Sequence, residues 1–166
     1  EEGFISLVLA TKPAQVTLVP DPPHVLTSNA GWDTRTHFDQ LKSVINTFKT
    51  AGIRTSIFME CDLELISLAA ETGADRIELY TEDFAREYAV DRDAAVAPYV
   101  AAAKHAISCG LGVNAGHDLS LENLAFLKKS IPEMAEVSIG HALIADALYY
   151  GLENTIQLYL NCLRES

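Results

Sequence analysis

The chain has 166 residues, of which 49% are hydrophobic and 21% charged, a composition typical of a globular domain with a hydrophobic core. Its formal net charge of −11 at pH 7 disfavours binding to a nucleic-acid backbone, although backbone N–H groups could still hold a small phosphorylated ligand. No apolar run approaches the ~18 residues that a membrane span requires. We therefore expect a single domain over residues 1–166, with neither membrane nor nucleic acid among its partners.

The cysteines Cys61, Cys109 and Cys162 lie far apart and form no CxxC pair. Their odd number and wide spacing argue against a disulfide framework or a zinc ribbon, so we expect reduced thiols packed in or near the core. The first residues also lack the basic segment of a signal peptide. Together these features favour a cytoplasmic location.

Short β-branched runs alternate with amphipathic segments along the chain. Asp62 and Ser120 are candidate N-caps. Pro98 is tolerated only in the first turn of a helix, so its helix should begin near residues 95–96. In chain order, the pattern predicts a helix at 4–10, a strand at 15–19, a long loop at 20–34, a helix at 38–50, a strand at 54–58, a helix at 63–71, a strand at 76–80, a helix at 94–108, a strand at 112–115, a helix at 121–129, a strand at 136–139 and helices at 142–150 and 153–163.

Strands that alternate with helices through short connections predict an α/β fold with a parallel sheet and right-handed crossovers. Two architectures are compatible with five such strands: an open doubly wound sheet, or strands 4–8 of a (β/α)8 TIM barrel. Alternation alone does not choose between them. In both architectures the functional site lies at the carboxyl ends of the strands.

Two successive strands end in Gly-His, at Gly116-His117 and Gly140-His141. Glycine lets the backbone approach a ligand closely, and histidine can exchange protons near neutral pH. A glycine turn that opens a helix at residue 140 would also present unpaired N–H groups to a phosphate. Either histidine could instead be a buried residue whose ring is satisfied by a neighbour.

Glu78 occupies a strand interior, where a carboxylate is costly unless it has partners. It either faces solvent or points into the mouth of a barrel, where it could stabilise charge. Thr27 and Ser28 place hydroxyl groups in the long loop, where they could contact a ligand or remain solvated. The spacing of His, Asp and Glu fits no metal site, and no nucleotide-binding glycine motif occurs.

The chain resembles the pyridoxine 5′-phosphate synthase family from its first helix to its end. The most specific feature is the Asn-Ala-Gly-His run at one strand end, followed at the next by Ile-Gly-His. The matching phrases are Thr11-Lys12-Pro13, Leu18-Val19-Pro20, Leu26-Thr27-Ser28, Gly31-Trp32-Asp33, Val113-Asn114-Ala115-Gly116-His117 and Ile139-Gly140-His141-Ala142.

The resemblance implies a cytoplasmic (β/α)8-barrel enzyme of vitamin B6 biosynthesis, in the transferase class. It would condense 1-deoxy-D-xylulose 5-phosphate with 3-amino-2-oxopropyl phosphate to give pyridoxine 5′-phosphate, phosphate and water. The chemistry would need no metal and no organic cofactor, because histidine and glutamate can carry the proton transfers. The resemblance also implies a homo-oligomer, with octamers typical of the family.

The resemblance assigns roles to individual residues. His117 matches the proton donor, and Glu78 matches a glutamate that stabilises the transition state. Thr27 matches a contact to deoxyxylulose phosphate. Gly140 and His141 match contacts to 3-amino-2-oxopropyl phosphate.

One site residue departs from the family pattern. Asp118 stands where many relatives have a glycine, and that glycine contacts 3-amino-2-oxopropyl phosphate, as Gly140 is expected to do. A carboxylate there would repel a phosphate unless it turned away, whereas its backbone N–H could keep the contact. The family's first three strands, which carry another histidine, another glutamate and phosphate-binding arginines, have no counterpart in these 166 residues. We therefore expect this chain, taken alone, to be inactive.

Two other functions remain open at this point. The chain could belong to another phosphate-handling barrel enzyme, such as an isomerase or epimerase of sugar phosphates. It could also be an inactive half-barrel that serves only in folding or assembly.

Overall fold

A computed structural model describes residues 2–21, 28 and 30–164. The elements run in the order α1 (Glu2–Thr11), β1 (Gln15–Leu18), α2 (Phe38–Thr50), β2 (Arg54–Met59), α3 (Leu63–Glu71), β3 (Arg76–Tyr80), α4 (Glu82–Ser108), β4 (Gly112–Gly116), α5 (Leu124–Ser130), β5 (Glu136–Ser138), α6 (His141–Tyr150) and α7 (Leu152–Arg164).

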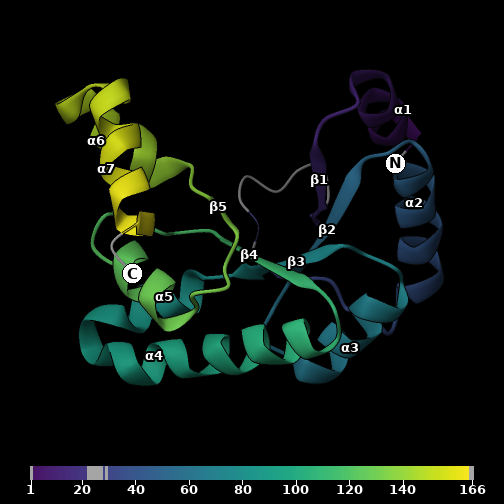
Figure 1. The fold of residues 1–166 in the computed structure, drawn as a ribbon, viewed down its shortest axis with the longest axis horizontal. Helices are drawn as coiled ribbons and strands as arrows, with labels where there is room; N and C mark the ends of the chain where they lie inside the picture. The colour runs from purple at the N-terminus through teal and green to yellow at the C-terminus, as the bar shows by residue number, and fades with distance from the viewer. Residues whose placement is uncertain (1, 22–27, 29, 165–166) are drawn as a thin grey trace.

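The strands form one parallel sheet in the order β1-β2-β3-β4-β5. The sheet is strongly curled, as shown by side chains from non-neighbouring strands that meet on its concave face. Thr17 on β1 reaches Glu78 on β3, and Arg54 on β2 reaches Glu136 on β5. Helices α2 to α5 lie outside this curl (Figure 1). Unlike a doubly wound sheet, the strand order never reverses, so the fold is part of a (β/α)8 barrel.

The outward side chains of the strands form the hydrophobic core with the helices. Ile57, Ile77 and Leu79 are fully buried on this face, as are Leu41 and Phe48 of α2. Burying each such side chain contributes about 1.5–3 kcal/mol to folding. The same alternation turns the polar residues of the strands inward, since neighbouring residues of a strand point to opposite faces.

At the amino ends of the strands, the concave face carries a polar network with one residue from each strand. Arg54 Nη2 lies 2.5 Å from Glu136 Oε1, and Arg76 Nη1 lies 3.1 Å from the same oxygen. Arg76 Nη1 also donates to Asn114 Oδ1 at 2.9 Å, and Arg54 Nε donates to Gln15 Oε1 at 2.8 Å. This network ties β1 and β2 to β4 and β5 below the carboxyl ends of the strands.

Several sequence predictions are confirmed. Helices α2 and α3 have the predicted bounds, and each strand lies within a residue or so of its predicted range. Asp62 caps α3, since its Oδ1 accepts hydrogen bonds from the N–H groups of Glu64 and Leu65. The prediction of Ser120 as an N-cap was wrong, because α5 begins at Leu124 with Asn123 as its N-cap residue. Ser120 instead opens the preceding turn, where its Oγ accepts from Glu122 N–H.

The prediction for α4 was wrong at its start. The helical segment begins at Glu82, well before residues 95–96, and Asp91 interrupts it with φ −154° and ψ 92°. Asp91 Oδ1 accepts a hydrogen bond from Ala94 N–H at 3.0 Å and so restarts the helix as a cap does. Pro98 therefore lies past the first turn of this second part, where it removes one backbone hydrogen bond.

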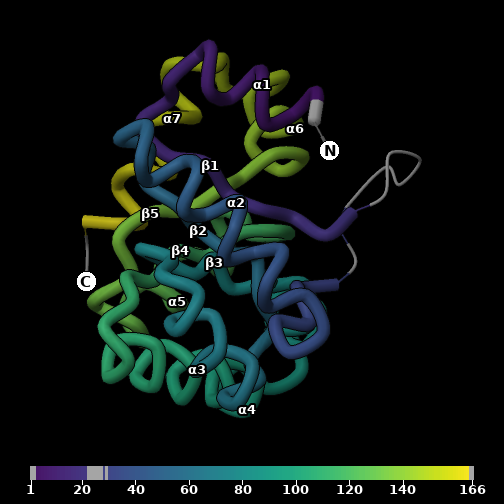
Figure 2. The backbone as a smooth tube through the Cα atoms, turned by 90° about the vertical axis from the view of Figure 1, so that its right-hand side faces the viewer, coloured from purple at the N-terminus to yellow at the C-terminus, as the bar shows by residue number. Residues whose placement is uncertain are grey.

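Helix α6 follows the last strand and packs against α7. Figures 1 and 2 place α1 on one side of the open curl and the α6–α7 pair on the other. Leu148 and Tyr149 of α6 are exposed to 83% and 86%. Within the described residues, no helix is both long enough and apolar enough to cross a membrane.

Candidate functional site

A cavity of about 710 Å³ opens on the concave face at the carboxyl ends of the strands. Residues from β1, β2, β3 and the segments after β4 and β5 line it, as expected for a barrel site. It contains every predicted site residue that the structure describes, namely Glu78, His117, Asp118, Gly140 and His141. Thr27 falls outside the described residues, although its neighbour Ser28 lines the cavity.

Glu78 points into this cavity from β3 and is only 6% exposed. The hydroxyl of Thr17 donates to its Oε2 at 3.1 Å, and Ser138 supplies a second side-chain hydrogen bond. Burial raises the pKa of the Glu78 carboxyl, the two hydroxyls lower it, and the charge of Glu136 raises it; the net shift is upward. Glu78 therefore takes up a proton more readily than an ordinary glutamate does.

Gly116 leaves room for this carboxyl group. A Cβ atom at position 116 would overlap Glu78 Oε1 and would lie 3.1 Å from Ser138 Cβ. Gly116 is paired with Ser138 in the β4–β5 register. The Glu78 carboxyl therefore lies over Gly116, where it reaches Thr17 of β1 and Ser138 of β5. The absence of a side chain at Gly116, the last residue of β4, therefore allows the Glu78 carboxyl to occupy its observed position on the neighbouring strand.

The chain turns sharply after β4 through two residues with left-handed backbone angles. His117 has φ 86° and Asp118 has φ 56°, values that residues other than glycine rarely adopt. Buried Thr81 anchors this turn, with its hydroxyl 2.9 Å from the carbonyl oxygen of Gly116 and 2.5 Å from that of His117. Asn123 Nδ2 donates to the carbonyl of Asp118 at 3.3 Å.

The His117 ring lies close to Asp118 on one side and to Tyr80 on another. Its Nδ1 lies 3.2 Å from Asp118 Oδ2, and the Tyr80 ring meets it edge to face at 4.9 Å between centroids. The Tyr80 hydroxyl donates to Glu82 and also lies 3.2 Å from the carbonyl oxygen of Ser28. Burial and the Glu82 carboxylate raise the pKa of Tyr80, so its hydroxyl stays protonated at neutral pH.

Gly140 and His141 open α6 at the edge of the cavity. Gly140 is the N-cap residue, and its carbonyl accepts from Ile144 N–H at 3.1 Å. The first N–H groups of a helix have no partner within it and carry the positive end of the helix dipole. The start of α6 can therefore offer hydrogen bonds to an anion in the cavity.

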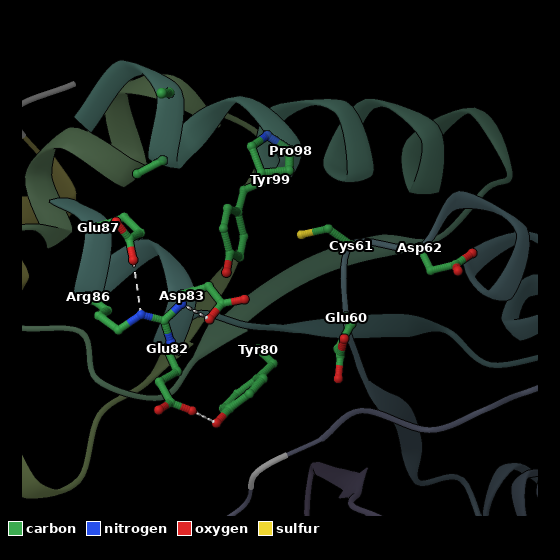
Figure 3. Close-up of a pocket in the computed structure, with 12 residues that line it drawn as sticks. Glu60, Cys61, Asp62, Tyr80, Glu82, Asp83, Arg86, Glu87, Pro98 and Tyr99 are labelled. Atoms are coloured by element: carbon green, nitrogen blue, oxygen red, sulfur yellow. Dashed lines mark hydrogen bonds and ion pairs between the residues drawn. The ribbon is translucent and has the colours of Figure 1, made fainter. Parts of the chain in front are cut away.

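A second cavity, of about 650 Å³, lies between the segment 60–62 after β2, the end of β3 and α4 (Figure 3). Its lining is strongly acidic, and its only guanidinium among the described residues, that of Arg86, is paired with Asp83 at 2.6 Å and with Glu87 at 3.0 Å. Glu60, which directly follows β2, lines this second cavity. A phosphate would be repelled here, so the cavity around His117 is the better candidate for a phosphorylated ligand.

Sequence reasoning missed the two hydroxyls that hold Glu78. Thr17 and Ser138 lie on β1 and β5, at the opposite edges of the sheet. Alternation along each strand could have assigned them to the same face as Glu78, but only the curl brings them into contact. Among the described residues, no group of three or more His, Cys, Asp and Glu side chains is placed to hold a metal ion.

A curled parallel sheet with a cavity at the carboxyl ends of its strands is the arrangement of (β/α)8-barrel enzymes. The family model described as "Pyridoxal phosphate biosynthesis protein PdxJ" matches residues 1–165, and the chain belongs to this family. It is similar to proteins named pyridoxine 5′-phosphate synthase. The one from Parabacteroides distasonis is 62% identical over 98% of this chain and 68% of its own length. Those from Bacteroides fragilis and Bacteroides thetaiotaomicron are 62% and 60% identical over 97% of this chain and 68% of theirs.

Proposed function

We propose that the chain provides part of the active site of a pyridoxine 5′-phosphate synthase. The reaction condenses 1-deoxy-D-xylulose 5-phosphate with 3-amino-2-oxopropyl phosphate and yields pyridoxine 5′-phosphate, phosphate and water. Membership of the family supports the reaction. The observation that carries the proposal is the cavity that unites His117 and Glu78 with the start of α6.

In this proposal His117 is the proton donor. The steps of the reaction are imine formation, enolisation, loss of phosphate and an aldol-type ring closure. These steps move protons to or from oxygen, nitrogen or carbon, which a histidine can do near neutral pH. The anchored turn at Thr81 and the edge of Tyr80 support this role, because they fix the backbone and the ring of His117.

Glu78 would stabilise the cationic character that develops in the imine-containing intermediates. Its burial supports this role, since a carboxylate interacts more strongly with a nearby positive charge where water is excluded. Hydrogen bonds from the hydroxyls of Thr17 and Ser138 would hold the carboxylate in a fixed orientation.

Gly140 and His141 would bind the phosphate of 3-amino-2-oxopropyl phosphate through the N–H groups at the start of α6. The backbone N–H of Asp118 would add a further contact to the same ligand. Its carboxylate lies 3.2 Å from Nδ1 of His117 and would have to turn away from a bound phosphate for this contact to form. We assign the contact to deoxyxylulose phosphate to Thr27 by resemblance alone.

The test is synthesis of pyridoxine 5′-phosphate by the full-length protein from the two substrates, followed by chromatography with fluorescence detection. We expect product without added metal or cofactor. His117→Asn should lower kcat by about 10²–10⁴-fold, the usual contribution of one general acid. His105→Asn is the matched control, because His105 lies on α4 and bonds to Ser67 of α3 away from the cavity.

A full-length protein that makes no pyridoxine 5′-phosphate but turns over a member of a sugar-phosphate panel would favour an isomerase or epimerase instead. The 166-residue chain assayed alone should be inactive, because its five strands leave the barrel open. We also propose a cytoplasmic homo-oligomer, and the exposed Leu148 and Tyr149 of α6 are compatible with assembly.

A further inference from the structure

A phenyl ring stands among the polar groups of the cavity around His117. Phe58 is the only Phe, Tyr or Trp side chain among the described residues that line this cavity. Its Cα atom pairs with that of Glu78 in the β2–β3 register. Paired residues of neighbouring strands lie about 5 Å apart, with their side chains on the same face of the sheet. The Phe58 ring therefore lies beside the carboxyl group of Glu78.

The position of the Phe58 ring is fixed by its neighbours. Its centroid lies 5.3 Å from that of the Tyr80 ring, and the two ring planes are tilted by 53°. The Tyr80 hydroxyl in turn contacts Glu82 and the carbonyl oxygen of Ser28. Trp32 N–H donates to the carbonyl oxygen of Phe58 at 2.9 Å. Because Phe58 is only 4% exposed, its ring has little freedom to turn away from the cavity.

Phe58 and His117 both pack against Tyr80. The His117 ring meets Tyr80 edge to face at 4.9 Å between centroids, and both His117 and Phe58 line the cavity. The phenyl group of Phe58 offers no hydrogen bond to a phosphate, a hydroxyl or an amino group. Its favoured partner is another aromatic ring, with which it gains stabilisation beyond the burial of apolar area.

The proposed reaction brings such a ring into this cavity. Neither substrate contains an aromatic ring, and the pyridine ring exists only after ring closure and loss of water. We infer that Phe58 packs against the pyridine ring, so that the cavity distinguishes the ring-closed product from the open-chain substrates. This inference rests on the proposed function, and it gives the apolar part of the cavity a role that His117 and Glu78 do not cover.

The experiment compares the wild-type full-length protein with Phe58→Leu by isothermal titration calorimetry. Leucine keeps an apolar side chain of similar size but has no ring. Two ligands are titrated separately: pyridoxine 5′-phosphate, which contains the pyridine ring, and 1-deoxy-D-xylulose 5-phosphate, which does not. Phe126→Leu is the matched control, because Phe126 lies on α5, contacts Tyr88 and Arg92, and does not line the cavity.

We expect Phe58→Leu to raise the Kd for pyridoxine 5′-phosphate about five-fold, which corresponds to the loss of one aromatic pair. The Kd for 1-deoxy-D-xylulose 5-phosphate should change by less than about two-fold, because leucine preserves the apolar contact. Phe126→Leu should leave both dissociation constants unchanged. A residue that only fills the core would not weaken the binding of one ligand and spare the other.

Equal losses of affinity for the two ligands in Phe58→Leu would overturn the inference, as would unchanged affinity for pyridoxine 5′-phosphate. A wild-type protein that does not bind pyridoxine 5′-phosphate would overturn it as well. If the selective loss is found but no form of the protein makes pyridoxine 5′-phosphate from the two substrates, recognition of the ring by Phe58 stands and the proposed function fails. Binding is measured without turnover, so the two failures are distinguishable.

Discussion

The carboxyl group of Glu78 lies where a side chain on Gly116 would begin. A Cβ atom at position 116 would overlap Glu78 Oε1 and stand 3.3 Å from its Cδ. The two residues come from neighbouring strands, and the contact explains why the strand before His117 ends in glycine without a left-handed backbone at that position.

Gly116→Ala should therefore reduce activity more than stability. The overlapping atom is the far end of a flexible side chain, so the protein can fold with the Glu78 carboxyl displaced. We expect a loss of about 1 kcal/mol in the free energy of unfolding, from weakened hydrogen bonds, and a fall of at least ten-fold in kcat. Chemical denaturation and the synthase assay measure the two effects.

A double-mutant cycle controls for other effects of the new methyl group. In a Glu78→Ala background the nearest contact of the new Cβ atom would be Ser138 Cβ, at 3.1 Å, so Gly116→Ala should then cost less in stability and in residual activity. Equal losses from Gly116→Ala in both backgrounds would contradict the spatial conflict between the two residues.

The hydroxyl of Thr17 should hold down the pKa of Glu78. Thr17→Val keeps the shape of the side chain but removes the donor to Oε2, so the already raised pKa of Glu78 should rise further. Thr17→Ser restores a hydroxyl and should return the pKa toward that of the wild type. ¹³C chemical shifts of the Glu78 carboxyl, followed through a pH titration, measure both. A Thr17→Val titration that matches the wild type would refute this prediction.

Glu78 should also make stability depend on pH. Its pKa in the folded protein is raised above its ordinary value of 4.5, so the folded state binds the proton more tightly than the unfolded chain does. Below pH 4.5 the buried carboxyl is neutral in both states and costs nothing. As the pH rises from about 4.5 through the raised pKa, ionisation progressively destabilises the folded state.

Glu78→Gln should remove this dependence and exceed the wild type in free energy of unfolding above that window. Glu133→Gln is the matched control, because Glu133 is exposed before β5 and should leave the pH profile unchanged. Urea titrations between pH 4 and pH 8 provide the comparison. Parallel profiles for the wild type and Glu78→Gln would show that the raised pKa has been assigned to the wrong group.

Cys61 should be a slow-reacting thiol. Burial, with smaller effects from the charges of Glu60 and Asp83, raises its pKa to about 12, so almost no thiolate exists at pH 8. Iodoacetamide should therefore alkylate Cys61 at least ten-fold more slowly in the native protein than after denaturation, as measured by mass spectrometry of the modified peptide. Equal native and denatured rates would contradict the prediction.

The sequence was sufficient to locate the strands, two complete helices and the Gly-His strand endings. Local signals of these kinds reside in neighbouring residues: alternation sets a strand, Asp62 caps its own helix, and glycine marks a turn. Even there, the break at Asp91 was missed, because a capping aspartate inside a long helical pattern does not differ in composition from an exposed helical residue.

Family resemblance pointed to the barrel, but the strand pattern of the sequence was equally compatible with a doubly wound sheet. Only the tertiary structure distinguishes the two architectures. Curvature decides it, and curvature arises from packing between segments distant in sequence. The Thr17–Glu78 pair spans 61 residues and the Arg54–Glu136 pair spans 82. By itself the sequence determined which residue types stand at the strand ends. Only the tertiary structure brings Thr17, Glu78, Gly116 and Ser138 into contact with one another. Their contact depends on the curl of the sheet and the register of its strands, and not on the conformational preferences of neighbouring residues.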